Sequence, residues 1–359
     1  MIDNKSLAED LLEFYDRDAR LLPFRLNPIP YHIWISEIML QQTRMDTVIP
    51  YFNRFIETLP GIKDLAEVDD DRLMKLWEGL GYYSRARNLK KAAQLIQTEY
   101  NGVMPASFEE LLKLPGIGPY TAGAIASIAF GETVPAVDGN VIRVFSRIMA
   151  YDGPAMTAPG RRFITDAVRS VMSTDRPGDF NQAVMELGAT ICLPNGAPLC
   201  HKCPINLYCK AYQAGNPLDY PVLPIKKARK IEKHTVLLIH QLFGTDQSFM
   251  LERRPDSGLL AGLYQFPMKS GQLDESEIRL WLQEFGITEF KLNGGPVAKH
   301  IFSHIEWHMI SYEVEVLSTL VSEDQPNYQW IEDKALDLIT LPTAFRVFRE
   351  KLAGLLAKP

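Results

Sequence analysis

Two carboxylates and one group of cysteines are the side chains of this sequence best suited to chemistry. Glu37 lies within the largely apolar stretch 31–43, where a helix is expected. A carboxylate among apolar neighbours loses solvation, which favours its protonated form. A carboxyl that is still protonated near neutral pH can act as a general acid. An ion pair of Glu37 with Arg25 or Arg44 is the structural alternative.

The second carboxylate, Asp138, stands in the turn 137–140. Asp is a common N-cap, so this position by itself predicts only the start of another helix. A catalytic role gains weight because a Gly-x-Gly turn between two expected helices precedes Asp138 in the chain.

That turn contains Gly116 and Gly118, which permit a positive φ and the close approach of another backbone. Ser107 and Glu110 form an S-x-x-E capping box that starts the helix before it. Residues 120–130 are small and apolar, as suits a tightly packed second helix. The free N–H groups and the dipole at the start of that helix suit one DNA phosphate. An ordinary packing corner is the alternative.

The 4 cysteines of the chain all lie within residues 192–209, with the pattern C-x7-C-x2-C-x5-C. In a chain expected in the cytosol, such a group is not a disulfide framework. Four thiolates suit a structural zinc site or an iron–sulfur cluster, and the spacing does not separate the two. The helical, DNA-facing context favours the iron–sulfur cluster.

The composition predicts a globular protein with two domains. The 359 residues are 46% hydrophobic and 23% charged. No apolar run approaches membrane-spanning length, and the N-terminus lacks the features of a signal peptide, so a cytoplasmic, nucleoid-associated protein is expected. The net charge of −6 arises entirely from residues 235–359. The preceding residues are neutral overall and can bind DNA through a clustered basic face.

Residues 77–89 place aromatic rings beside basic side chains. Tyr82 and Tyr83 are followed by Arg85 and Arg87, a combination suited to a nucleic-acid surface. For Tyr83, a ring folded onto the core is an equal alternative.

The pattern changes from helical to strand-like at residue 235. Segments 235–243, 248–254 and 308–317 read as strands, whereas 274–286 reads as a helix. A segment rich in Pro and basic residues, 212–233, separates these elements from the helical part.

Together these pieces resemble the helix-hairpin-helix DNA glycosylases of the endonuclease III type, and within them the adenine DNA glycosylase (MutY) family. Two features depart from the family pattern. The first cysteine loop, 193–199, has seven residues without charge, and Phe24 stands where the family commonly has Trp. The matching segments are LPFR (22–25), WISEIMLQQTR (34–44), GLGYYSRARNL (79–89), LPGIGPYTAG (114–123), VDGNVIRVFSR (137–147) and NQAVMELGA (181–189).

The resemblance implies a multidomain protein. An all-α helix-hairpin-helix glycosylase core with an iron–sulfur loop would occupy residues 1–211, and an α+β Nudix-like domain that recognises 8-oxoguanine would follow the linker 212–233 in residues 234–359. The implied enzyme is a base-excision-repair hydrolase. It would cleave the N-glycosidic bond of adenine opposite 8-oxoguanine or guanine in double-stranded DNA, as a monomer with a 4Fe–4S cofactor.

Two other functions were weighed against this one. A non-catalytic iron–sulfur protein that binds lesions would have lost Glu37 or Asp138, and both are present. A nucleotide pyrophosphohydrolase acting through the C-terminal domain would need a Glu-rich helix that holds Mg²⁺, and residues 274–286 do not fit one.

The resemblance also implies a role for each site residue. Glu37 would protonate the adenine, and Asp138 would stabilise or capture the sugar cation. Tyr120 stands where strand-nicking relatives carry the lysine that forms a Schiff base, so no lyase step is expected. The other implied roles are orientation of the carboxylates by Tyr120 and Asn140, contacts to the extruded adenine by Arg25 and Gln182, DNA binding or intercalation by Gln42, Thr43, Tyr82, Gly116 and Gly118, recognition of 8-oxoguanine by Phe302, Ser303 and His304, and cluster ligation by Cys192, Cys200, Cys203 and Cys209.

Overall fold

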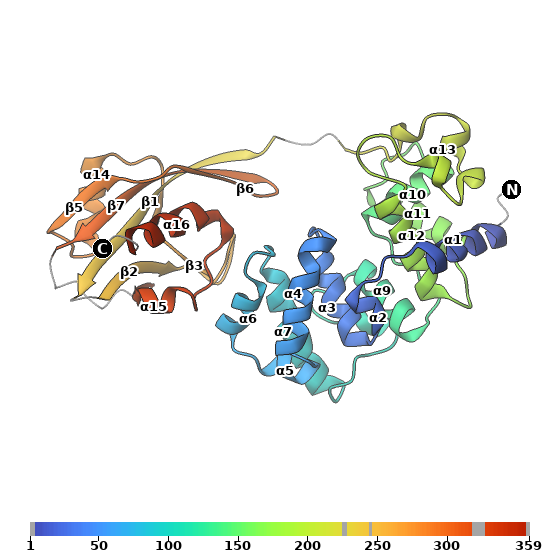
Figure 1. Ribbon diagram of the computed structural model, residues 1–359, viewed down its shortest axis with the longest axis horizontal. Helices are drawn as coiled ribbons and strands as arrows, with labels where there is room; N and C mark the ends of the chain where they lie inside the picture. Colours follow the sequence, from blue (N-terminus) through green and yellow to red (C-terminus); the bar gives the residue numbers. More distant parts are fainter. Residues whose placement is uncertain (1–3, 225–227, 244–245, 318–326, 357–359) are drawn as a thin grey trace. The chain divides into compact units, whose positions relative to one another are not determined.

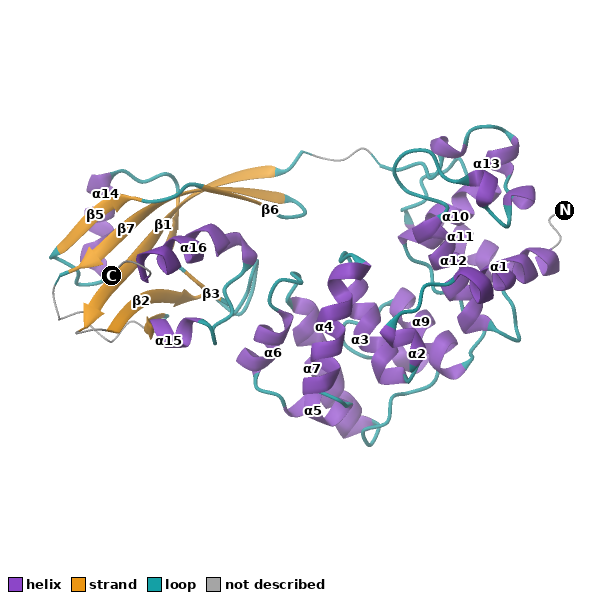
Figure 2. Cartoon of the chain, viewed as in Figure 1, coloured by secondary structure: helices purple, strands orange, loops and turns teal. Residues whose placement is uncertain are grey.

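The computed structural model describes residues 4–224, 228–243, 246–317 and 327–356. The chain divides into two compact units, one of residues 1–68 with 87–226, and one of residues 69–86 with 227–359. Figure 2 shows that the strands belong to the second unit, while the first is helical. The predicted order of an all-α part followed by an α+β part is confirmed.

The first unit consists of helices joined by short loops (Figure 1). Helix α7 (Ser84–Glu99) begins in the second unit and continues in the first. The other elements of the first unit are α1 (Asn4–Asp18), α2 (Pro23–Leu26), α3 (Pro30–Leu40), α4 (Met45–Thr58), α5 (Ile62–Glu67), α8 (Phe108–Leu111), α9 (Pro119–Phe130), α10 (Gly139–Met149), α11 (Ala158–Val171), α12 (Pro177–Thr190), η1 (Cys200–Lys202), η2 (Asn206–Tyr208), α13 (Lys210–Gln213) and η3 (Pro217–Asp219).

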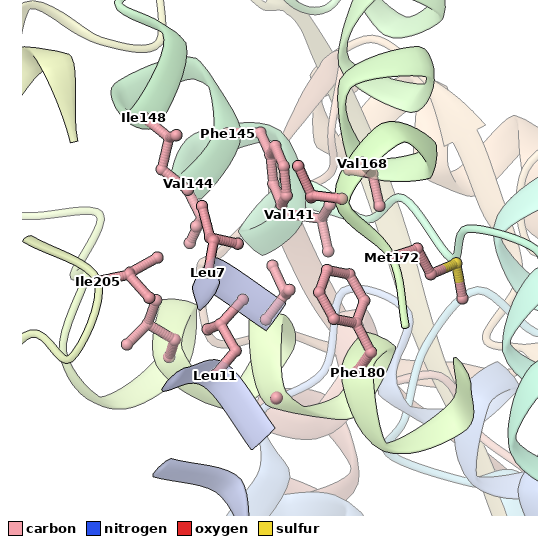
Figure 3. Packing of buried hydrophobic residues seen from close by; sticks show 14 of the residues in the cluster. Leu7, Leu11, Val141, Val144, Phe145, Ile148, Val168, Met172, Phe180 and Ile205 are labelled. Atoms are coloured by element: carbon pink, nitrogen blue, oxygen red, sulfur yellow. The ribbon is translucent and has the colours of Figure 1, made fainter. Parts of the chain in front are cut away.

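Helix α10 anchors one half of this unit. Its apolar residues recur at positions 141, 144, 145 and 148, the spacing of one helix face. Figure 3 shows Val144 and Phe145 of this face close to Leu7 of α1, with Phe180 of α12 in the same core. Because this face is buried, the turn before α10 is held in one place.

Helix α9 packs between α3 and α12. Its small residues allow close packing, since a Cβ added at Gly123 would overlap the carbonyl of Pro135. The loop that leads to Asp138 therefore lies directly against α9, while α3 brings Glu37 to another side of the same helix.

The second unit contains one mixed eight-stranded sheet with the order β3-β2-β1-β7-β5. Its central pair, β1 and β7, is parallel from Lys230↔Ile305 to Gln241↔Val316, and every other pair is antiparallel. The elements are α6 (Asp70–Trp77), β1 (Lys230–Phe243), β2 (Asp246–Arg253), β3 (Tyr264–Gln265), β4 (Met268–Ser270), α14 (Glu275–Glu284), β5 (Phe290–Gly294), β6 (Ala298–Ile301), β7 (Ile305–Val316), β8 (Tyr328–Glu332), α15 (Asp333–Leu336), η4 (Thr343–Phe345) and α16 (Arg346–Leu356).

The two faces of this sheet carry separate cores. Val236 and Leu238 of β1 pack with Phe345 and Phe348 on one face. Leu237 and Ile239 of β1 pack with α14 on the other face of the sheet. Successive side chains of a strand point to opposite faces, so a strand buried on both sides reads as a continuous apolar run.

Several local expectations change in the structure. Helix α3 ends at Leu40 rather than at residue 43. Helix α12 begins at Pro177, with Arg176 as N-cap; the sequence around residues 179–192 predicts a later start, with Asp179 as N-cap, but Asp179 lies in the first turn. Ser107 caps α8 as predicted, but the Glu110 carboxylate accepts from the hydroxyl of Tyr100 at 2.8 Å.

No helix among the described residues combines the length and the apolar character needed to cross a membrane.

Candidate active site

One cavity of about 830 Å³ in the first unit brings most of the predicted catalytic residues together. It is lined by α3, by the start of α9, by the turn before α10 and by one face each of α11 and α12. The predicted site residues that line it are Arg25, Glu37, Gln42, Thr43, Gly118, Tyr120, Asp138, Asn140 and Gln182.

Glu37 is buried in this cavity, with 7% of its surface exposed. Burial, together with the nearby charge of Asp138, raises the pKa of Glu37 to about 7, and the hydrogen bond from Tyr120 limits this rise. The Tyr120 hydroxyl donates this bond to Oε2 of Glu37. Burial also raises the pKa of Tyr120 well above its usual value. Glu37 can therefore carry a proton near neutral pH.

Asp138 caps helix α10 and faces the same cavity. Its Oδ1 accepts from the N–H of Val141 at 2.8 Å, and its Oδ2 accepts from the Asn140 amide at 2.7 Å. Burial raises the pKa of Asp138, while both of these hydrogen bonds oppose the shift. Asp138 thus caps α10 and also lines the cavity that contains Glu37.

Glu186 was not predicted as a site residue, yet it lines the cavity. Its side chain is fully buried and binds Arg25 at 2.8 Å. It also accepts from Nη2 of Arg20 at 3.1 Å. Although burial opposes ionisation, these two guanidinium groups hold the pKa of Glu186 below its usual value. Arg25 is therefore paired with Glu186, not with Glu37.

Two arginines of α10, Arg143 and Arg147, were also missed. The guanidinium of Arg143 donates to Oδ1 of Asn140 and to the carbonyl oxygens of Gly188 and Cys192, each at 2.8 Å. Arg147 donates to Sγ of Cys192 at 3.1 Å. The motif VDGNVIRVFSR contains both residues, but their partners become adjacent only when α12 packs against α10.

The residues predicted to enter DNA have unusual backbones. Gln42 has φ 59° and Tyr82 has φ 47°, both in the left-handed region. Side chains with a Cβ are strained there, and such strain often marks functional positions. Thr43 follows Gln42 in the turn after α3, whereas Tyr83 is buried, as its structural alternative predicted.

The two hairpin glycines differ. Gly116 has φ 80°, and a Cβ added there would lie 2.6 Å from Cβ of Asn88. Gly118 has φ −95°, so it does not use the positive φ that a glycine permits. A Cβ at Gly118 would meet nothing within 4 Å. Gly118 instead leaves the N-terminus of α9 open to an approaching group.

Phe302, Ser303 and His304 form the turn between β6 and β7 of the second unit. Ser303 and His304 are exposed, while the Phe302 ring packs against Trp307 at 4.8 Å between centroids. Within the same unit, the Tyr82 hydroxyl and Oγ of Ser303 are 2.7 Å apart. The turn therefore exposes the polar side chains of Ser303 and His304, while the ring of Phe302 packs against Trp307.

The four cysteines are free thiols on the loop after α12. Cys192 interacts electrostatically with Cys200, Cys203 and Cys209. In the part of the chain that the structure describes, no three His, Cys, Asp or Glu side chains converge to hold a metal ion. Four Cys thiolates are the ligand set of a 4Fe–4S cluster, and a structural zinc ion accepts the same set.

Helix α14 lacks a metal site of the hydrolytic kind. Its last residue, Glu284, binds Nζ of Lys269 with both carboxylate oxygens, each at 2.8 Å. The same ammonium lies 4.8 Å from the centre of the Trp281 ring. Glu284 is thus held in an exposed ion pair, and α14 contributes to no group of three His, Cys, Asp or Glu side chains among the described residues that could hold a metal ion.

Comparison with known proteins supports the same interpretation. A family model described as HhH-GPD superfamily base excision DNA repair protein matches residues 35–158, and a NUDIX domain model matches residues 236–351. Among solved structures, a thermostable thymine-DNA glycosylase is similar with a TM-score of 0.54 and 28% identity, over 59% of this chain and 97% of that one. A non-covalent endonuclease III–DNA complex, 23% identical, shares the fold with a TM-score of 0.51, over 60% of this chain and 99% of that one.

Curated relatives cover nearly the whole chain. The adenine DNA glycosylase of Rattus norvegicus is 34% identical over 98% of this chain and 80% of its own length. That of Homo sapiens is 33% identical over 96% of this chain and 74% of its own. With the buried acid, the capping carboxylate and both domain matches in place, the chain belongs to the adenine DNA glycosylase family and is a base-excision-repair enzyme.

Proposed function

We propose that this protein removes adenine paired with 8-oxoguanine or guanine in double-stranded DNA, without cutting the strand. The observation that carries the proposal is a buried carboxyl, Glu37, with a pKa of about 7 in the same cavity as Asp138. Adenine leaves poorly unless it is protonated, so a proton donor poised near neutral pH is what the reaction needs.

In the proposed reaction, Glu37 gives its proton to N7 of the extruded adenine. The C1′–N9 bond breaks, and its electron pair leaves with the base. The remaining sugar cation is stabilised by the Asp138 carboxylate, or captured by it before water adds to C1′. Tyr120 and Asn140 orient the two carboxylates through the hydrogen bonds described above.

We assign recognition of the adenine to two residues that line the cavity, Gln182 and Arg25. The guanidinium of Arg25 is held by Glu186. Base extrusion requires side chains that fill the gap in the duplex, a role that we assign to Gln42, Thr43 and Tyr82. Gly116 and Gly118 would receive a phosphate at the start of α9.

The proposal also assigns a role to each of the two domains. We assign residues 1–211 to catalysis and residues 234–359 to recognition of 8-oxoguanine through Phe302, Ser303 and His304. The protein would act as a monomer at the nucleoid. The exposed positions of Ser303 and His304 suit hydrogen bonds to a base edge.

Cys192, Cys200, Cys203 and Cys209 would hold a 4Fe–4S cluster. When bound, the cluster cross-links the loop that follows α12. Protein purified anaerobically should be brown and contain about four irons per chain if all four thiolates bind one cluster. A colourless, active protein with stoichiometric zinc would contradict this assignment.

A single-turnover assay on an A:8-oxoguanine duplex tests the proposed reaction. Excision should produce an abasic site that breaks only after alkali is added, because Tyr120 cannot form the imine needed for strand cleavage. Strand breaks without alkali, or an intact adenine, would refute it.

A further inference from the structure

The active-site cavity continues beyond the carboxylates along helix α11. Besides Glu37 and Asp138, the cavity is lined by four residues of α11, namely Arg161, Arg162, Thr165 and Arg169. At 3.6 residues per turn these four positions fall within a stripe of about 100°. The face of α11 next to this stripe is fixed, because Ile164 and Val168 are buried in the core shared with α10 and α12. The arginine stripe is therefore held toward the cavity by the packing of α11.

This part of the cavity carries a net positive charge. In the inner part, Arg20 and Arg25 share one carboxylate, that of Glu186. In the outer part, Arg169 pairs with Asp166 at 3.2 Å, an exposed pair that water screens. The structure gives Arg161 and Arg162 no acidic partner among the described residues. Arg161 donates only to the carbonyl of Met156, at 3.3 Å.

The length of the stripe suits a polymer better than a small anion. From residue 161 to residue 169 a helix rises about 12 Å. Along the axis of a DNA duplex, where one strand rises 3.4 Å per nucleotide, that distance covers roughly three steps. The loop 193–199 has no charged residue, so it offers no cation to a phosphate.

We propose that the α11 arginines, Arg161, Arg162 and Arg169, bind backbone phosphates of the DNA strand that carries the target base. The inference rests on the proposed function, since it needs a base extruded into the cavity. In the proposed reaction Glu37 and Asp138 act on that base and its sugar inside the cavity, so the strand that enters the cavity must continue along one of its walls. The α11 wall offers guanidinium groups, which bind phosphate through paired N–H donors.

The salt dependence of DNA binding tests the site. The probe is a labelled duplex with a 2′-fluoro-deoxyadenosine, which resists excision, opposite 8-oxoguanine. Each phosphate contact contributes about 0.9 to the slope of log K against log salt, so Arg161→Gln with Arg162→Gln should reduce the slope by roughly 1.8.

A charge-matched control is Arg17→Gln with Arg54→Gln, two exposed arginines that do not line the cavity. Its slope should equal that of the wild-type protein. Arg161→Lys with Arg162→Lys should restore most of the slope, since lysine keeps the charge. An unchanged slope in the glutamine variant, or an equal loss in the control, would overturn the proposal.

Neutral methylphosphonate linkages, used in place of phosphates, identify the DNA strand that the α11 arginines bind. Placed beside the target base on its own strand, they should weaken binding by the wild-type protein and have little effect on the glutamine variant. The opposite result, with sensitivity confined to the other strand, would refute the strand assignment. If the wild-type chain excised no base, the proposed function would fail, whereas the salt slopes on the 2′-fluoro probe do not require excision and would still test the α11 site.

Discussion

The cavity of the first unit and the β6–β7 turn of the second use polar side chains in opposite ways. Glu37 is buried and held by Tyr120, and its burial is what raises its pKa to about 7. Ser303 and His304 are exposed on a turn whose backbone is fixed by Phe302 and Trp307. Proton transfer needs a group removed from water, whereas reading a base edge needs donors and acceptors that a ligand can reach. Burial and exposure are therefore separate requirements, met in separate units.

Replacing the buried acid should have the largest effect. Glu37→Gln keeps the shape and can still accept a hydrogen bond from Tyr120, but it has no proton to give. Single-turnover excision should fall by about 10²–10⁴, while binding to the mispair persists. Glu110→Gln, which changes a carboxylate outside the cavity, is the matched control. Excision by Glu37→Gln close to the wild-type rate would remove Glu37 from the mechanism.

The capping carboxylate should come second. Asp138→Asn retains an oxygen that can accept from the N–H of Val141, so the melting temperature should change little. The rate should fall by about 10²–10³, because a neutral amide cannot balance the sugar cation. Asp274→Asn makes the same change at the N-cap of α14 in the other unit. A normal rate combined with a lower melting temperature would mean that Asp138 is only a cap.

The pH profile should show a smaller, graded effect. Glu37 must be protonated to act, so the excision rate should be level below pH 7 and fall about tenfold per unit above it. The hydrogen bond from Tyr120 lowers the pKa of Glu37, so Tyr120→Phe should move the falling limb to higher pH. A rate independent of pH between 7 and 9 in the wild-type protein would contradict the assignment.

The smallest effect is expected at the exposed turn. Ser303→Ala with His304→Ala should slow excision opposite 8-oxoguanine by roughly two- to tenfold, as for one or two lost hydrogen bonds. Excision opposite guanine should change less. Tyr82→Phe removes the hydroxyl that contacts Ser303 and separates this internal contact from base recognition. Equal losses on both duplexes would show that the turn supports folding or clamping only.

Patterns among residues close in the sequence predicted the helices around the active-site cavity. Ser107 caps α8, the small residues of α9 pack closely, and Asp138 caps α10, all as the sequence indicated. These features depend on neighbours in the chain, so residue type and spacing suffice to predict them.

Pairings between distant segments could not be predicted in this way. Glu186 binds Arg20 and Arg25 across more than 160 residues of chain. Arg143 joins Asn140 to the end of α12. Such contacts exist only after helices pack, because no local pattern specifies the partner of a charged side chain. The parallel pairing of β1 with β7 is likewise a product of topology.

The left-handed backbones at Gln42 and Tyr82 have a consequence for protein engineering. Glycine adopts such a conformation without strain, so glycine at either position should fold at least as well as the native residue. A screen that selects only for heat resistance would tend to choose glycine there and discard the side chains proposed to enter DNA. Thermostability gained at these positions would come with loss of the activity for which the strain is retained.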